Sequence, residues 1–308
     1  MTHKPLTSLY GIIFCSACVT ALVLRPAPAM AQAAPDPAAQ AAQAPPGGPI
    51  APVVAIVGED YRVEFSAGAW VTRPSTVNYS DTETITSTSG TVATTTTLNG
   101  SLVDFRSLLG LSYQTFPEGH LTVKIAPKQK LRGEYIPLLY KQTVESLPAT
   151  IYFNGQTYAA GQTVESTYHW NEWKLIYEYD WLTFDRGFVG PQAALSSMNV
   201  SAATANSAQS GTASVNILMP GLGAVGRYYL MDKLSVTVDF LGFLLPGGDT
   251  STHAHSLEID GNVTYNFNKH VGAQIGVRAW DAGHVWNSPL NTGSITVVGP
   301  YVGGTGRF

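Results

Sequence analysis

Histidine and acidic side chains come close together along the chain where they could bind a metal. In the sequence THAHS, His253 and His255 share one face of an extended chain, and Asp249 lies nearby. Two histidines are too few for a structural zinc site, which takes four ligands. We therefore predict no metal and expect these residues to lie at the polar edge of a loop.

Two other pairs of residues are candidates for general acid–base chemistry. His169 lies near Glu172, and His284 lies near Asp281, so each pair joins a histidine to a carboxylate. At the rim of a protein such pairs could serve a hydrolase acting on lipid or peptide. Neither pair forms a recognisable motif, and these residue types are common at solvated surfaces. We predict that the chain is not an enzyme, with a rim hydrolase as the alternative.

Glycine-rich and cysteine-containing stretches offer no further chemistry. The sequences GLGAVGR and VGGTGR lack the lysine and the order of strand, loop and helix that a phosphate-binding loop needs. Both cysteines, Cys15 and Cys18, lie in an N-terminal segment that we expect to be removed, which excludes thiolate and disulfide chemistry. A lipoprotein acylated on Cys18 is an alternative. We predict no cofactor.

The N-terminal residues are typical of an export signal. Lys4 precedes the apolar run LYGIIFCSACVTALVL, and small residues then suit cleavage after Ala31 or Ala33. A retained membrane anchor is the alternative, although a spanning helix needs about 20 apolar residues. Loss of Lys4 and Arg25 with the signal changes the formal charge from −4 to −6. Without a clustered basic surface, we expect no nucleic-acid partner.

The rest of the chain divides into a linker and one folded domain. We predict a signal peptide over residues 1–31, an Ala/Pro-rich disordered linker over 32–58 and a β-domain over 59–308. Only 12% of the residues are charged, against roughly 25% in an average soluble domain. The β-domain alternates apolar and polar residues with period two, as in LEIDGNVTYNF, LSVTVDF and EWKLIYEYDW.

This alternation predicts ten strands, and the connections between them differ in length. The strands are predicted at residues 61–73, 120–126, 131–140, 172–181, 188–200, 213–229, 234–240, 257–267, 271–281 and 294–308. Four connections are tight and five are longer or more polar, the longest including the Thr-rich residues 74–101. Short turns at one end and long loops at the other are typical of outer-membrane barrels. We predict an all-β fold, a transmembrane antiparallel β-barrel of about ten strands, with eight or twelve as alternatives.

In such a barrel the apolar face of each strand meets lipid and the polar face meets the lumen. The predicted lipid-facing aromatic residues are Trp173, Tyr177, Tyr179, Trp181, Tyr265 and Phe267. The predicted lumen charge network consists of Arg62, Glu64, Lys124, Arg132, Glu134, Glu172, Lys174, Glu178, Arg227, Asp239, Glu258, Asp260 and Arg278. Both signs are present in similar numbers, so we expect paired charges in a lumen filled by side chains. A charged channel is the alternative.

The signal, the amphipathic strands, the short turns and the terminal sequence GGTGRF together resemble bacterial outer-membrane β-barrel proteins. The stretches LRGEYIP, FNGQTY, YEYDW and VGAQIGVR are similar to small members of this kind, over about residues 60–308. The resemblance implies location in the outer membrane, contact with its lipid, and reading of Phe308 by the barrel-assembly machinery. It implies no catalytic residue. The expected function is a structural envelope role or a narrow pore for small solutes, with surface recognition or adhesion as a further alternative.

Overall fold

The computed structural model describes residues 59–80, 83–89, 92–98, 100–247, 253–285 and 292–308. These residues form sixteen strands, and they contain no helix. Among them, no helix meets the length and hydropathy needed to cross a bilayer. The predicted signal peptide and linker, residues 1–58, lie outside the described residues.

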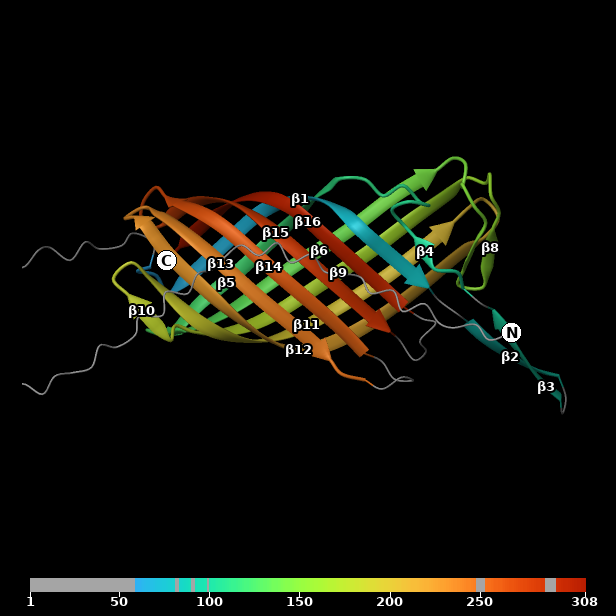
Figure 1. Ribbon diagram of the computed structural model, residues 1–308, viewed down its shortest axis with the longest axis horizontal. Coiled ribbons are helices and arrows are strands. Elements are labelled where there is room, and N and C mark those ends of the chain that lie inside the picture. The colour runs from blue at the N-terminus through green and yellow to red at the C-terminus, as the bar shows by residue number, and fades with distance from the viewer. Residues whose placement is uncertain (1–58, 81–82, 90–91, 99, 248–252, 286–291) are drawn as a thin grey trace, which may run out of the picture. The chain divides into compact units, whose positions relative to one another are not determined.

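Ten strands pair in antiparallel order and close into a barrel (Figure 1). They are β1 (Val63–Ser80), β5 (Gln114–Ala126), β6 (Gln129–Val144), β9 (Val164–Tyr179), β11 (Gly187–Ala205), β12 (Ser210–Met231), β13 (Leu234–Leu245), β14 (His253–Asn266), β15 (Val271–Val285) and β16 (Thr292–Arg307). Pairing of β16 with β1 completes the ring. The prediction of ten strands is confirmed, and the alternatives of eight and twelve are wrong.

Six short strands lie outside the ring or extend it. The pair β2 (Glu83–Ser89) and β3 (Val92–Leu98) and the pair β7 (Ile151–Phe153) and β8 (Gln156–Tyr158) are hairpins. β4 (Val103–Asp104) pairs with β1, and β10 (Leu182–Phe184) pairs with β11. The Thr-rich stretch that we expected to be a loop therefore contains the end of β1 and the hairpin β2–β3.

The barrel has a turn end and a loop end. At the turn end, short connections join β5 to β6, β12 to β13 and β14 to β15, and the last residue of the chain lies there (Figure 1). The loop end carries β4 and β8, and β7 pairs with β8 there. Phe308 completes the pairing at the turn end, because its amide donates to the carbonyl of Val63 and its carbonyl accepts from Arg62.

The outer surface of the barrel changes from apolar to polar along the strands. On β12, the outward residues Leu218, Leu222 and Tyr228 are exposed apolar side chains, whereas Ser214 and Asn216 occupy the same face nearer the loop end. Leu218 and Tyr228 are ten positions apart on β12. At ~3.3 Å per residue, and with the strand tilted by about 40° from the barrel axis, this stretch, the apolar band, spans a height of roughly 25 Å, which is the height of a barrel's lipid-facing surface. The strands therefore extend beyond this band at the loop end.

The interior changes in the opposite sense. Towards the turn end the inward side chains are charged, and towards the loop end they form an apolar core around Trp70, Trp170 and Trp280, which are at most 1% exposed. The expected polar lumen is therefore wrong for the loop-end half. The physical reason is that strands with a polar exterior must bury their apolar face inside, as in a soluble β-sandwich.

Two substitutions on the outer face of β12 test the position of the apolar band. We predict that Leu222→Arg destabilises the barrel in phospholipid vesicles by about 2–4 kcal/mol, because it places a cation against lipid tails. Ser214→Arg is the matched control, on the same face of the same strand, and should cost less than ~1 kcal/mol. Urea-dependent folding into vesicles measures both. Equal losses would contradict the assigned band.

Candidate functional site

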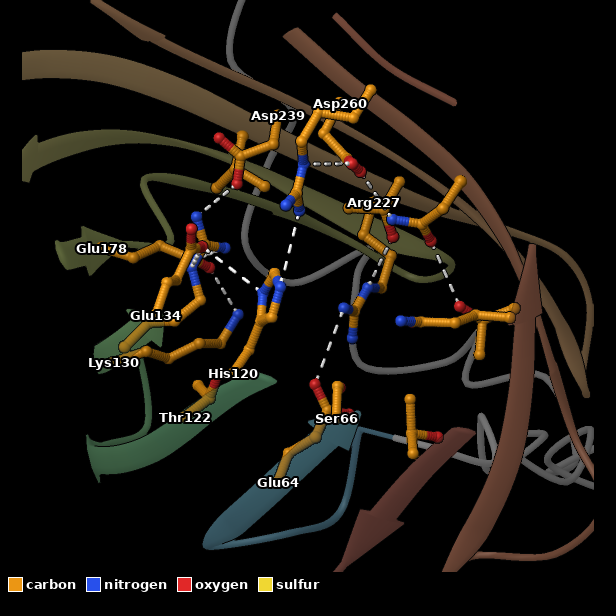
Figure 2. Close-up of a pocket in the computed structure, with 18 of the residues that line it drawn as sticks. Glu64, Ser66, His120, Thr122, Lys130, Glu134, Glu178, Arg227, Asp239 and Asp260 are labelled. Carbon is orange, nitrogen blue, oxygen red and sulfur yellow. Dashed lines mark hydrogen bonds and ion pairs between the residues drawn. The ribbon is translucent and has the colours of Figure 1, made fainter. Parts of the chain in front are cut away.

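The candidate site is a network of charged side chains that fills the turn-end half of the lumen (Figure 2). Period-two alternation aims every second residue of each strand inward, so neighbouring strands bring their charges together. Figure 2 shows acidic and basic side chains from β1, β5, β6, β9 and β12–β14 pointing into one cavity. The network therefore comes from residues far apart in the sequence.

Lys174 on β9 lies at the centre of the network. Its side chain is fully buried and forms an ion pair with Glu258, while its Nζ lies 3.6 Å from Glu134 Oε2 and 3.7 Å from Glu172 Oε2. Glu172 also accepts a hydrogen bond of 2.5 Å from the hydroxyl of Ser196. One lysine thus serves three carboxylates.

Arg278 on β15 holds a second group of carboxylates. Its Nη1 lies 2.9 Å from Glu118 Oε2, and its Nε lies 3.1 Å from Glu258 and 3.2 Å from Asp260. Tyr301 donates a hydrogen bond of 2.8 Å to Asp260. Because Glu258 contacts both Arg278 and Lys174, the two groups form one continuous network.

Cations on β6 extend the network towards the turn end. Lys130 lies 2.7 Å from Glu178 and 3.0 Å from Asp180, and Arg132 lies 2.7 Å from Glu134 and 2.5 Å from Asp239. All four of these carboxylates are buried or half-buried. Charges withdrawn from water need such partners, since an unpaired buried charge is costly.

Glu59, which lies four residues before the start of β1, closes the network at the turn end. Glu59 lies 3.2 Å from Lys124 Nζ and 2.9 Å from Arg227 Nη1, and it accepts a hydrogen bond of 2.9 Å from the Tyr229 hydroxyl. Burial raises the pKa of the Glu59 carboxyl, but the charges of Arg227, Lys124 and Lys130 together lower it by more. The resulting pKa is about 2. Glu59 is therefore ionised and pairs with cations on β5 and β12.

A small cavity remains between these side chains. Its volume is about 80 Å³, and its lining includes His120, Glu134, Arg227 and Asp239 (Figure 2). A buried water needs roughly 10–15 Å³ of such space, so on the order of five waters fit. This is a small pocket with a charged lining within an ion-paired lumen.

The structure places the predicted lumen residues inward, with the exception of Arg62, which is exposed. Arg62 lies before the first residue of β1, where the strand alternation has not begun, and Tyr61 takes the buried position instead. The sequence analysis missed several members of the network. They are Glu59, Glu118, His120, Lys130, Asp180 and Arg307.

The residue pairs proposed for catalysis are separated by the barrel wall. His169 and Glu172 lie on opposite faces of β9, with Glu172 buried in the lumen. His284 is buried inward, whereas Asp281 points outward and lies 3.7 Å from His255. Within the described residues, no cluster of three or more His, Cys, Asp or Glu could hold a metal ion. Asp249 lies outside the described residues.

The predicted lipid-facing aromatic residues lie on the outer face. Their exposure ranges from 38% to 67% in the set Trp173, Tyr177, Tyr179, Trp181, Tyr265 and Phe267. Tyr135 stacks on Trp173 with ring centroids 4.2 Å apart. Large exposed rings on a barrel exterior are typical of the membrane interface, where an apolar body and a polar edge are both satisfied.

Comparisons with known proteins find similar solved structures. No protein-family model matches the chain, and no curated protein sequence matches it. The outer membrane protease OmpT from Escherichia coli is similar over 80% of this chain and 97% of its own, with 9% identity and a TM-score of 0.43. The translocator domain of the autotransporter NalP from Neisseria meningitidis covers 80% and 88%, with 12% identity and a TM-score of 0.41. A Pseudomonas aeruginosa FadL homologue covers 81% and 91%, with 8% identity and a TM-score of 0.37. These structural neighbours are bacterial outer-membrane β-barrel proteins, and the similarity concerns the fold alone.

Substitution of the central lysine tests the energetic role of the network. We predict that Lys174→Met lowers the free energy of unfolding by about 3–5 kcal/mol, because Glu134, Glu172 and Glu258 lose a shared buried counter-charge. Urea titration of the folded protein in detergent measures the loss. The control is Arg186→Ala, which breaks a surface pair with Asp232 and should cost less than ~1 kcal/mol. A similar small cost for both variants would contradict a tightly coupled lumen.

Proposed function

We propose that the protein is an outer-membrane barrel with a sealed lumen, which has a structural role in the envelope and holds a rigid cap outside the lipid. The apolar band and the closed hydrogen-bonded ring support the membrane location, because a barrel in lipid must satisfy every backbone polar group internally. The single observation that supports a sealed lumen is that two layers of side chains fill it, one apolar and one charged.

The two layers block passage in different ways. In the loop-end layer, Trp170 packs edge-on against Trp280 with centroids 4.9 Å apart, and both rings are at most 1% exposed. In the turn-end layer, ion pairs surround a small pocket of about 80 Å³. An ion that crossed would have to break the charge network and then enter an apolar core, so the structure favours a structural barrel over a pore.

The connections at the loop end extend the apolar core and close it. Phe105, in the segment after β4, lies 6.1 Å from the ring of Phe153 on β7 and 5.7 Å from that of Tyr168 on β9. The Asp104 carboxylate accepts hydrogen bonds from the amides of Arg106 and Ser107, which fixes the turn. These contacts hold the described part of the loop end as a packed cap.

Surface recognition is a second candidate function, and one feature of the cap favours it. An open cleft of about 560 Å³ lies at the tip of the β11–β12 hairpin. Its lining is mostly hydroxyl and amide side chains with one carboxylate, namely Thr143, Gln162, Thr163, Glu165, Ala205, Asn206, Ser207 and Ala208. Polar clefts on rigid supports suit binding of a polar partner.

We propose further that the protein is not an enzyme acting at its rim. The split of His169 from Glu172, and of His284 from Asp281, across the barrel wall supports this. A base must lie within hydrogen-bond reach of the proton that it takes, and these pairs do not share a face.

Planar-bilayer recording tests the sealed lumen. We expect no conductance steps from the folded wild-type protein, because both layers are filled. Trp170→Ala with Trp280→Ala should give brief openings, since it hollows the apolar layer. Trp173→Ala with Trp181→Ala is the matched control on the outer face and should remain silent. Regular steps from the wild-type protein would overturn the sealed lumen and favour a narrow pore.

Phe308 is proposed as the residue by which the barrel-assembly machinery reads the chain. Its ring is 79% exposed on the outer face, so it adds little to packing. We predict that Phe308→Ala reduces the heat-modifiable, folded form in cell membranes several-fold, while spontaneous folding into detergent changes little. Val302→Ala, on the same face of β16, is the control. Equal folding of Phe308→Ala and wild type in cells would contradict the proposed role.

A further inference from the structure

Three cations and a tyrosine gather on the outer face of β1, β5 and β6, where the apolar band ends. Arg73 lies on β1, Lys141 on β6, and Tyr113 directly before β5, while Arg106 reaches the same face from the segment after β4. We call Arg73, Arg106, Tyr113 and Lys141 the edge cluster. Arg73, Lys141 and Tyr113 are exposed, and Tyr113 is 67% exposed despite its large ring.

Contacts and register place the cluster on adjacent strands. The guanidinium of Arg73 lies 5.8 Å from the Tyr113 ring centroid, and the side-chain amide of Gln114 donates a hydrogen bond of 3.2 Å to the carbonyl of Lys141. Arg106 Nη1 donates a hydrogen bond of 2.6 Å to the carbonyl of Ser75, two residues beyond Arg73. Because β5 lies between β1 and β6, Arg73 and Lys141 are two strand spacings of ~4.8 Å apart, or about 10 Å. Their long side chains can therefore reach one ligand placed between them.

The cluster lies at the edge of the apolar band. Val71 and Leu139, two residues before Arg73 and Lys141, are outward apolar side chains with 38% and 39% exposure. Ser75, two residues after Arg73, is exposed and polar. If the apolar band lies in lipid, the cluster is therefore at the depth of the headgroups, where the stems of arginine and lysine contact chains and their charges contact polar groups.

The cluster carries positive charge that the described residues do not balance. In the part of the chain that the structure describes, neither Arg73 nor Lys141 has a carboxylate within ion-pair distance, whereas the lumen cations Lys174 and Arg278 each contact three. The exposed Arg186 at the turn end is paired with Asp232. Unbalanced cations on a chain of net negative charge call for an external anion.

We propose that the edge cluster binds the phosphate groups of a membrane lipid in the leaflet at the loop end, one whose headgroup carries more than one negative charge. This rests on the proposed membrane location. Arginine and lysine form charge-assisted hydrogen bonds with phosphate oxygens, and the tyrosine hydroxyl adds a neutral donor. Three cations exceed the single charge of a phosphodiester lipid, so the headgroup that fits carries more than one negative charge, as phosphate monoesters do.

Lipid titration of the folded full-length protein in neutral detergent tests this site. Native mass spectrometry gives the fraction of barrels that retain lipid A, dephosphorylated lipid A or phosphatidylglycerol. We expect lipid A to bind at least about tenfold more tightly than either of the others, because dephosphorylated lipid A has no phosphate and phosphatidylglycerol has only one singly charged phosphodiester. Arg73→Ala with Lys141→Ala should weaken lipid A binding about tenfold or more.

The control variant removes the same charge from the other end of the barrel. Lys128→Ala with Arg186→Ala deletes two exposed turn-end cations and should change lipid A binding by less than about twofold. Equal weakening by both double variants, or equal binding of lipid A and phosphatidylglycerol, would overturn the proposal. Insertion into membranes is measured separately by heat-modifiable mobility, so a protein that inserts without lipid preference refutes only this site.

Discussion

The structure depends on closure of the hydrogen-bonded ring between β16 and β1. This pairing runs from Glu64 opposite Arg307 to Ser80 opposite Thr292. Without it, two strands would expose unpaired amides and carbonyls, which in lipid cost several kcal/mol each. The ring also fixes the register of every strand, and the register decides which side chains meet inside. The ion pair between Arg307 and Glu64, which oppose each other in this pairing, is one direct result.

Closure makes the interior narrow, and a narrow interior must be filled by matched side chains. At the turn end the exterior is apolar, so the inward positions carry the charges, and these charges need partners because little water remains. At the loop end the exterior is polar, so the inward positions carry the core. The two halves follow one rule: the strands alternate throughout, and the surrounding solvent decides which face is apolar.

Much of this was predictable from the sequence, and the failures have particular causes. Ten alternating segments gave the ten strands, and alternation placed Lys174, Glu258 and Arg278 inside. Glu118 was missed because the strand was predicted to begin two residues later, and Lys130 was missed because it was assigned to a turn. Arg62 was misplaced because alternation was extended past the start of β1. Pairing partners across the lumen depend on barrel closure, which no local pattern specifies.

The exchange of the apolar and polar faces along the strands could also have been predicted from the sequence. On β9 the inward positions run from Glu178 and Lys174 to Trp170 and Tyr168, while the outward positions change from Tyr177 to Thr167. Period two is unbroken across this change, so a search for alternation alone finds one continuous strand and misses the boundary. The boundary is nevertheless where the chemistry of the exterior changes, from side chains that suit lipid tails to side chains that suit headgroups and water. The edge cluster lies at this boundary and the polar cleft lies beyond it, so both candidate interaction sites are where the exterior no longer suits lipid tails.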